Sequence, residues 1–374
     1  MEPEASLPWL ALTLTPGIAA RLAARLLREY GSPEGVFRAS LRGIEACNVP
    51  APVAQSIFKK QFFWRAEKEV AELRRLGATA IHWNEPGYPQ NLLQIYDPPV
   101  MLYVRGDASL LNAPALGIVG TRRPTVYGTQ MAERLGRDLA ARGLCIVSGL
   151  ARGIDAIAHH GATAVGGRAI GVLGTGIDVC YPKENKKLYE KVLERGAIIS
   201  EYATGSHASP QNFPVRNRII AGMPLGVIIV EGKQYSGSLI TARLAMEFGR
   251  EVFGVPGNVT QEVSFAPNQL IKQGAKLITN ADDVIEELPT PVRAALLQAE
   301  PMEAEQRNLL VAEGLTATQK VIFDLLSADE PKPIDEIVEA SGLNSSVVLA
   351  TLFEMEMKGF VKQLPGKQFA RVLL

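Results

Sequence analysis

The sequence predicts an α/β protein: a doubly wound, mostly parallel sheet between a small N-terminal helical domain and a C-terminal winged helix. Three observations predict it. Short apolar runs alternate with amphipathic segments over residues 116–255, amphipathic segments alone precede them, and helical stretches followed by a short hairpin pattern end the chain. Regular β–α alternation is typical of a parallel sheet with helices on both faces.

Length, charge and cysteine usage limit the class of protein. The chain has 374 residues, enough for two or three domains, and its 39 Lys and Arg balance 39 Asp and Glu. Any affinity for nucleic acid must therefore come from a local patch. Cys47, Cys145 and Cys180 match no zinc or disulfide pattern, and no signal peptide or membrane-length apolar run is found. We expect a reduced, cytoplasmic protein with no metal and no membrane contact.

Residues 1–86 are predicted to form the helical domain. Residues 18–30 and 58–76 have apolar side chains at helical spacing. Residues 15–18, Thr-Pro-Gly-Ile, resemble the hairpin of helix–hairpin–helix DNA-backbone binders but lack its second glycine. Packing or protein contact on the one hand, and DNA binding on the other, both remain open. A proline-rich stretch at 88–106 predicts an ordered connection to the next domain.

Residues 87–286 are predicted to form the sheet domain. Its strands are expected at Leu116–Val119, Cys145–Ser148, Ala169–Leu173, Ala197–Ser200, Leu225–Val230 and Glu251–Val255. Its helices are expected at Met131–Arg142, Asp155–Val165, Lys186–Arg195, Asn217–Ala221 and Ser238–Phe248. Ligands of such sheets bind at the carboxyl ends of the strands.

The first of these strands leads into the stretch that organises the domain. Leu116 to Gly128 reads as a buried strand, a glycine turn with Arg122 and Arg123, and the start of a helix. Because unpaired N–H groups at a helix N-terminus attract phosphate, the turn predicts a phosphate site, although an ordinary strand-to-helix turn uses the same residues. Glycine, serine, threonine or charge also follows most of the other strands, which favours a binding edge.

Two further segments predict the chemistry of the ligand. Residues 181–187 carry three lysines, and residues 210–218 interleave Phe213 with prolines, amides, Arg216 and Arg218. An aromatic ring among cations suits unpaired nucleic acid, whose bases stack and whose phosphates are anionic. Solvated lysines and a core phenylalanine are the alternatives.

Catalytic residues and cofactors are not predicted. His159 and His160 are adjacent and so point to different faces of a helix. The acids Asp155, Asp178 and Glu201 have no His or Cys partner at a spacing that indicates a triad. The Gly174–Gly176 pair lacks the third glycine of a dinucleotide fingerprint.

Five ordered motifs resemble the DprA (Smf) DNA-processing family over about residues 88–280. They are IVGTRRPTVYG, SGLARGIDAIAH, GTGIDVCYPKEN, NFPVRNRIIAG and SGSLITA. The resemblance implies an extended Rossmann-like domain that binds single-stranded DNA without sequence preference, forms homodimers and helps load the RecA recombinase during natural transformation. It implies no catalytic activity and no cofactor.

The resemblance also implies site residues. By matching motif, Arg122 and Lys183 hold the DNA backbone, while Phe213, Arg216 and Arg218 form the second wall of the groove. The other residues carried over as DNA contacts are Gly120, Thr121, Gly174, Gly176, Asn185, Asn217 and Ser238. The dimer interface is expected at Leu270, Ile271 and Leu277.

The C-terminal part is predicted as a linker, 287–313, and a winged helix, 314–374. Helices at Thr316–Ser327, Ile334–Ser341 and Ser345–Lys358 precede a hairpin. The third helix offers Glu354 and Glu356 but few side chains that read bases, which favours protein contact over duplex binding.

The sequence as a whole predicts a protein that binds single-stranded DNA and presents it to RecA. Two alternatives stay open. One is a nucleotide-processing enzyme of a related Rossmann-like superfamily, in which Asp155 or Glu201 does acid–base work on a nucleoside phosphate. The other is a transcription regulator that acts through the winged helix.

Overall fold

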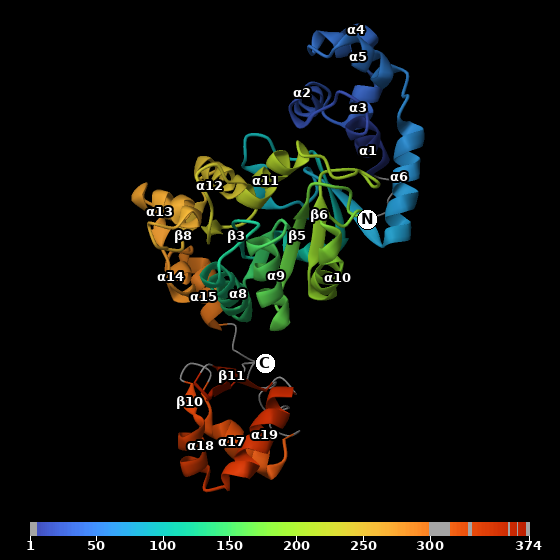
Figure 1. The fold of residues 1–374 in the computed structure, drawn as a ribbon. Helices are drawn as coiled ribbons and strands as arrows, with labels where there is room; N and C mark the ends of the chain where they lie inside the picture. The colour runs from blue at the N-terminus through green and yellow to red at the C-terminus, as the bar shows by residue number, and fades with distance from the viewer. Residues whose placement is uncertain (1–5, 299–314, 328–330, 358–359, 365, 372–374) are drawn as a thin grey trace. The chain divides into compact units, whose positions relative to one another are not determined.

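The computed structural model describes residues 6–298, 315–327, 331–357, 360–364 and 366–371. The chain divides into two compact units, residues 1–297 and 298–374, each of which is described by itself. Figure 1 shows the larger unit as a central sheet with helices on both faces and a helical module at its N-terminus. The predicted fold class is confirmed.

The N-terminal module consists of short helices packed around their own apolar core. Its helices are α1 (Leu7–Thr13), α2 (Ala20–Tyr30), α3 (Pro33–Arg38), α4 (Leu41–Ala46), α5 (Ala51–Phe58) and α6 (Phe63–Leu76). Ser32 and Ser40 cap α3 and α4 by accepting hydrogen bonds from the N–H groups three residues on. The buried core runs from Leu10 and Leu26 to Tyr103 of the sheet, so the module is attached to the sheet by apolar packing.

The large sheet has nine strands in the order β1-β2-β6-β5-β4-β3-β7-β8-β9. The strands are β1 (Ala78–His82), β2 (Met101–Gly106), β3 (Ala115–Val119), β4 (Cys145–Ser148), β5 (Ala169–Leu173), β6 (Ala197–Ser200), β7 (Gly226–Ile229), β8 (Glu251–Gly254) and β9 (Lys276–Leu277). Strands β3 to β9 pair in parallel, and β1 and β2 add an antiparallel edge beside β6.

Two of these strands correct the predicted domain boundary. Strand β1 lies before residue 87 and β2 lies inside the proline-rich stretch that was expected to be a connection. The sheet therefore begins inside the segment predicted as helical domain. The sequence signal was weak because β1 is a short run of small residues and β2 follows Pro98-Pro99 directly.

The helices of this unit cover both faces of the sheet. They are α7 (Gln90–Leu93), α8 (Val126–Ala141), α9 (Ile154–Ala164), α10 (Lys186–Arg195), α11 (Asn212–Gly222), α12 (Gly237–Glu247), α13 (Phe265–Lys272), α14 (Ala281–Ile285) and α15 (Thr290–Gln298), with 3-10 turns η2 (Ala108–Asn112), η3 (Lys183–Asn185) and η4 (Glu262–Ser264). One core packs α8 and α9 against one face, and a second packs α11 and α12 against the other. This arrangement leaves the carboxyl edge of the strands to the connecting loops (Figure 1).

Helices α8 and α9 pack closely enough to require glycine. A Cβ at Gly161 would lie 2.3 Å from the Glu133 carbonyl oxygen. We expect Gly161→Ala to lower the free energy of unfolding by about 1–3 kcal/mol, since the helices must separate. Urea denaturation followed by circular dichroism measures this. Gly87→Ala is the matched control, because a Cβ there meets nothing within 4 Å; equal stability of the two variants would contradict the close packing.

The second unit has the expected winged-helix elements. They are α17 (Ala317–Leu325), β10 (Lys332–Pro333), α18 (Ile334–Ser341), α19 (Ser345–Met357), β11 (Val361–Leu364) and β12 (Gln368–Arg371). The strands form an antiparallel sheet in the order β10-β12-β11, and Thr316 and Gln319 form a capping box at α17. Part of the predicted linker is wrong, because Thr290–Gln298 is helix α15; residues 299–313 of that linker lie outside the described residues.

Candidate nucleic-acid interface

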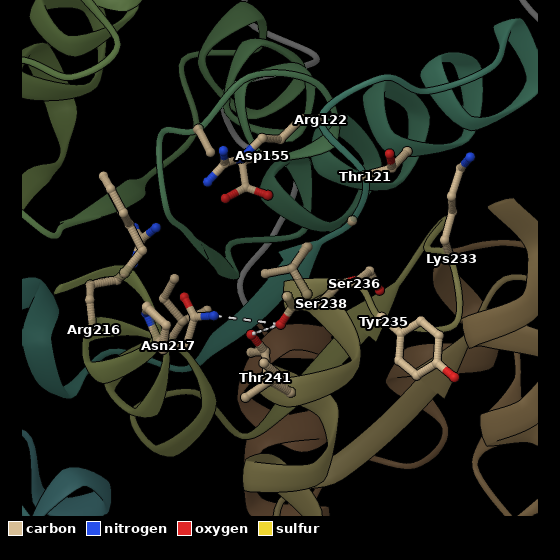
Figure 2. Close-up of a pocket in the computed structure, with 18 of the residues that line it drawn as sticks. Thr121, Arg122, Asp155, Arg216, Asn217, Lys233, Tyr235, Ser236, Ser238 and Thr241 are labelled. Carbon is tan, nitrogen blue, oxygen red and sulfur yellow. Dashed lines mark hydrogen bonds between the residues drawn. The ribbon is translucent and has the colours of Figure 1, made fainter. Parts of the chain in front are cut away.

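A cavity of about 920 Å³ opens at the carboxyl edge of the sheet. Its walls come from the end of β3, the start of α11 and the loop that leads into α12, where the described strands end. Figure 2 shows Arg216 and Asn217 on one side, Lys233 and Tyr235 on the other, and Ser236 and Ser238 between them.

Phe213 is the centre of an aromatic and cationic cluster in this cavity. Its ring centroid lies 5.4 Å from that of Tyr181, and the guanidinium carbons of Arg122 and Arg216 lie 5.9 and 6.0 Å from it. Helix α11 begins at Asn212, five residues earlier than predicted, and Asn212 Nδ2 donates to the Gly174 carbonyl at 2.9 Å. The half-buried ring is thus fixed at a helix start with one cation on either side.

Arg216 lines the cavity, but its hydrogen bonds are internal. Its side chain is only 5% exposed, and Nη1 donates to the carbonyls of Gly149, at 2.8 Å, and Val172. A Cβ at position 149 would lie 2.4 Å from Nη1, which is why glycine stands there. Burial lowers the pKa of Arg216 to about 10, so the group stays charged at neutral pH. Arg216 supplies positive potential behind Phe213.

The phosphate site predicted at the start of α8 is wrong. Glu231, 2% exposed at the end of β7, accepts hydrogen bonds from Thr125 N at 2.9 Å and Thr125 Oγ1 at 2.5 Å. The Thr121 N–H donates to the Glu231 carbonyl at 2.8 Å and is also unavailable. A carboxylate of the protein therefore occupies the position that a phosphate would take. Arg122 remains exposed beside it.

The N-terminus of α12 faces the cavity instead. Ser236, Gly237 and Ser238 line the cavity at the first residues of this helix. The N-cap residue Ser236 makes no side-chain capping bond, since its Oγ lies 2.8 Å from Ser238 Oγ. Backbone N–H groups at such an uncapped helix start suit an anion.

The two acids of the enzyme alternative are both engaged by the protein. Asp155 is buried and accepts from the Gly149 N–H at 3.1 Å; burial raises its pKa, while Arg216 and that N–H act in the opposite direction. Glu201 accepts from Arg218 Nη2 at 2.6 Å. Neither acid is placed as a free acid–base group in the cavity.

The predicted DNA contacts divide into two groups. Those that line the cavity are Gly120, Thr121, Arg122, Phe213, Arg216, Asn217 and Ser238. Those outside its lining are Gly174, Gly176, Lys183, Asn185 and Arg218. Lys183 is exposed in η3, two residues after Tyr181, which does line the cavity.

Three residues of the second group support the site without facing it. Gly174 is buried against the Phe213 ring. The Gly176 N–H donates to the Ser206 carbonyl at 2.9 Å, so it is not free for phosphate. Asn185 Nδ2 donates to the Leu150 carbonyl at 2.8 Å and holds the loop after β4.

Arg218 contradicts its predicted place in the groove wall. It is 6% exposed, donates to Glu201, and its Nε lies 3.7 Å from an Asp97 oxygen. Residues two apart on a helix point in different directions, and α11 turns Arg218 away from the cavity that Arg216 lines. Arg218 is part of a buried ion pair.

Sequence reasoning missed one cavity residue and gave no role to another. Tyr235 is 90% exposed in the loop before α12, and Lys233 Nζ lies 2.5 Å from Glu262 Oε2. The available signal was an aromatic ring between Gly232 and Gly237, where the chain has little else to bury it.

The predicted dimer residues have different environments. Leu270 is fully buried in the core, so its prediction as an interface residue is wrong. Ile271 is half-buried, near Gly254 of β8. Leu277 is 44% exposed on the edge strand β9 and remains a candidate contact.

His159 gives the unfolding free energy a pH dependence. It is 0% exposed, and burial lowers its pKa to about 4, against about 6.5 in an unfolded chain. Between these values the unfolded chain binds a proton that the native protein lacks. The free energy of unfolding should therefore fall as pH drops from 7 towards 4, by at most about 1.4 kcal/mol per unit. Urea titrations at pH 7 and 5 should show a smaller fall in His159→Gln; equal falls would contradict the assignment.

Fold and site together define a class: Rossmann-like α/β proteins with a cationic, aromatic ligand cavity at the carboxyl edge of the sheet. The sequence model of DNA recombination-mediator protein A matches residues 79–289, and that of the DprA winged helix domain matches residues 298–367. The first match spans more than half of the chain. The chain belongs to the DNA recombination-mediator protein A (DprA/Smf) family.

Individual relatives agree with this assignment. The chain is 43% identical to DNA processing protein DprA of Bacillus subtilis over 62% of the chain and 78% of that protein. It is 32% identical to protein Smf of Synechocystis over 97% of the chain and 98% of that protein. A crystal structure of DprA from Streptococcus pneumoniae superposes with a TM-score of 0.66 at 33% identity, covering 77% of this chain and 98% of that one.

A second solved structure concerns a bound strand. DNA processing protein A from Helicobacter pylori, described for its single-stranded DNA binding mode, superposes with a TM-score of 0.51 at 33% identity, covering 56% of this chain and 94% of that one. Along the described chain, no helix is both long and apolar enough to cross a membrane.

Proposed function

We propose that the protein binds single-stranded DNA without sequence preference in the cavity at the carboxyl edge. The observation that carries the proposal is the Phe213 ring, held between the guanidinium groups of Arg122 and Arg216 in an open cavity. Bases of any identity stack on aromatic rings, and their phosphates are attracted to the cations.

The rest of the cavity supports the same ligand. Tyr181 and Tyr235 offer further rings, and the start of α12 at Ser236 offers backbone N–H groups to a phosphate. No strand or helix is placed to read base edges there, which agrees with sequence-independent binding.

Fluorescence anisotropy tests the proposal. Labelled oligo(dT) and oligo(dA) should bind with similar affinity, and a matched duplex should bind at least about tenfold more weakly. The logarithm of the affinity should fall linearly with the logarithm of salt concentration. Equal binding of duplex and single strand, or a strong preference for one base, would contradict the proposal.

We further propose that the protein acts without catalysis or a cofactor, as a cytoplasmic homodimer that helps load RecA during natural transformation. The family assignment supports this proposal. Adding the protein should shorten the lag before RecA hydrolyses ATP on single-stranded DNA coated with a single-strand-binding protein. An unchanged lag would contradict the RecA part and leave the DNA-binding part standing.

A further inference from the structure

The corner between α5 and α6, residues 58–68, holds two large aromatic side chains outside the core. Trp64 is 63% exposed and Phe58 is 50% exposed. Other rings of the same module are packed: Trp9 stacks on His82 at 4.0 Å, and Phe63 meets Phe37 edge-on at 4.8 Å. The module therefore has an aromatic core and still leaves these two rings in water, which calls for a ligand.

Positive charge surrounds the two rings. Lys59, Lys60 and Lys68 are exposed, and none forms an ion pair with a residue that the structure describes. Trp64 and Lys68 are four residues apart and share one face of α6. Glu67 is the exposed carboxylate within residues 58–68. The corner is thus cationic and aromatic, in a chain whose net charge is zero.

The backbone of the corner is ordered, so the rings are presented in fixed positions. The Lys60 N–H donates to the Ile57 carbonyl at 2.9 Å, and the Gln61 N–H donates to the Ser56 carbonyl at 3.1 Å. Lys60 adopts a left-handed conformation, φ 50°, which is unfavourable for a residue with a side chain and persists only where the surroundings fix it. Little ordering of this backbone would be needed on binding.

The same helix is tied to the loop that leads to the cavity. Glu69 of α6 is 6% exposed and accepts from Thr204 N at 2.7 Å and Thr204 Oγ1 at 2.8 Å. Thr204 lies between β6 and α11, the helix that begins at Asn212 and carries Phe213. Helix α6 is therefore held to the sheet domain rather than hinged from it.

We propose that this corner is a second contact for an unpaired polynucleotide strand, with Trp64 and Phe58 stacked on bases and the lysines on phosphates. Exposed rings among unpaired lysines are complementary to single strands, which offer base faces and an anionic backbone together. The inference rests on the proposed function for the choice of ligand, and it adds a contact outside the cavity.

Intrinsic fluorescence tests it. Of the 3 tryptophans, Trp9 is buried and Trp83 half-buried, so Trp64 is the accessible one. Titration with a long oligo(dT) should quench the tryptophan emission of the wild type. Trp64→Phe should lose most of the quench and keep most of the affinity. Trp64→Ala should weaken long oligo(dT) about fivefold or more.

Charge variants complete the test. Lys59→Glu with Lys60→Glu should weaken binding and shift the quench to higher oligonucleotide concentration. Lys187→Glu with Lys191→Glu is the control of equal charge on α10 and should have a smaller effect. Binding by anisotropy with no Trp64-dependent quench would overturn the inference alone. Absence of oligo(dT) binding by the wild type would overturn the proposed function instead.

Discussion

Arg122→Ala combined with Lys183→Ala is expected to weaken oligo(dT) binding by about 100-fold at about 0.1 M salt. Both side chains are exposed, and Arg122 lies at the cavity beside Phe213. Each lost phosphate contact releases fewer counterions, so the salt slope should become shallower by about 1.4 for two contacts on a single strand. Anisotropy titrations at several salt concentrations measure both quantities.

The control for this variant removes two cations elsewhere. Arg134→Ala with Lys191→Ala takes charge from helices α8 and α10, where each residue has an exposed acidic neighbour, Asp138 and Glu194. Its salt slope should stay within about 0.3 of the wild type. A double variant of Arg122 and Lys183 that binds as the control does would place neither residue on phosphate.

Arg218→Ala is expected to lower the free energy of unfolding by about 3–5 kcal/mol. The substitution leaves the Glu201 carboxylate buried without its partner and removes the nearby cation from Asp97. Urea denaturation followed by circular dichroism measures the loss. The folded fraction should bind oligo(dT) within about twofold of the wild type, since Arg218 does not line the cavity.

A second variant separates loss of the ion pair from loss of a DNA contact. Arg218→Met with Glu201→Leu replaces both charges by apolar groups of similar size and should recover much of the stability. If Arg218→Ala were as stable as the wild type but bound DNA at least tenfold more weakly, Arg218 would belong to the groove after all.

The sheet strands that could be predicted are those with a clear local pattern. Strands β4, β5 and β6 have the bounds expected from their apolar runs, because buried parallel strands need continuous apolar residues. Strand β1 has small residues and β2 follows two prolines, so their membership in the sheet depends on pairing with β6, far along the chain.

The site was predictable to the extent that it is local. Arg122 and Phe213 reach the cavity from motifs that read as a turn and an aromatic–cationic segment. The sequence could not show that Glu231, 106 residues from Thr125, fills the start of α8. Nor could spacing alone decide which of Arg216 and Arg218 faces the cavity, since both are buried on α11 and differ only in their partners.

Photo-crosslinking tests the central claim most directly. An oligo(dT) carrying 5-iododeoxyuridine, bound to the full chain and irradiated, should form crosslinks that mass spectrometry maps to peptides containing Phe213, Tyr181 or Tyr235. Those rings line the cavity at the distances at which a base could stack on them. Saturated binding with crosslinks on other peptides and none on these would show that the strand binds outside the cavity.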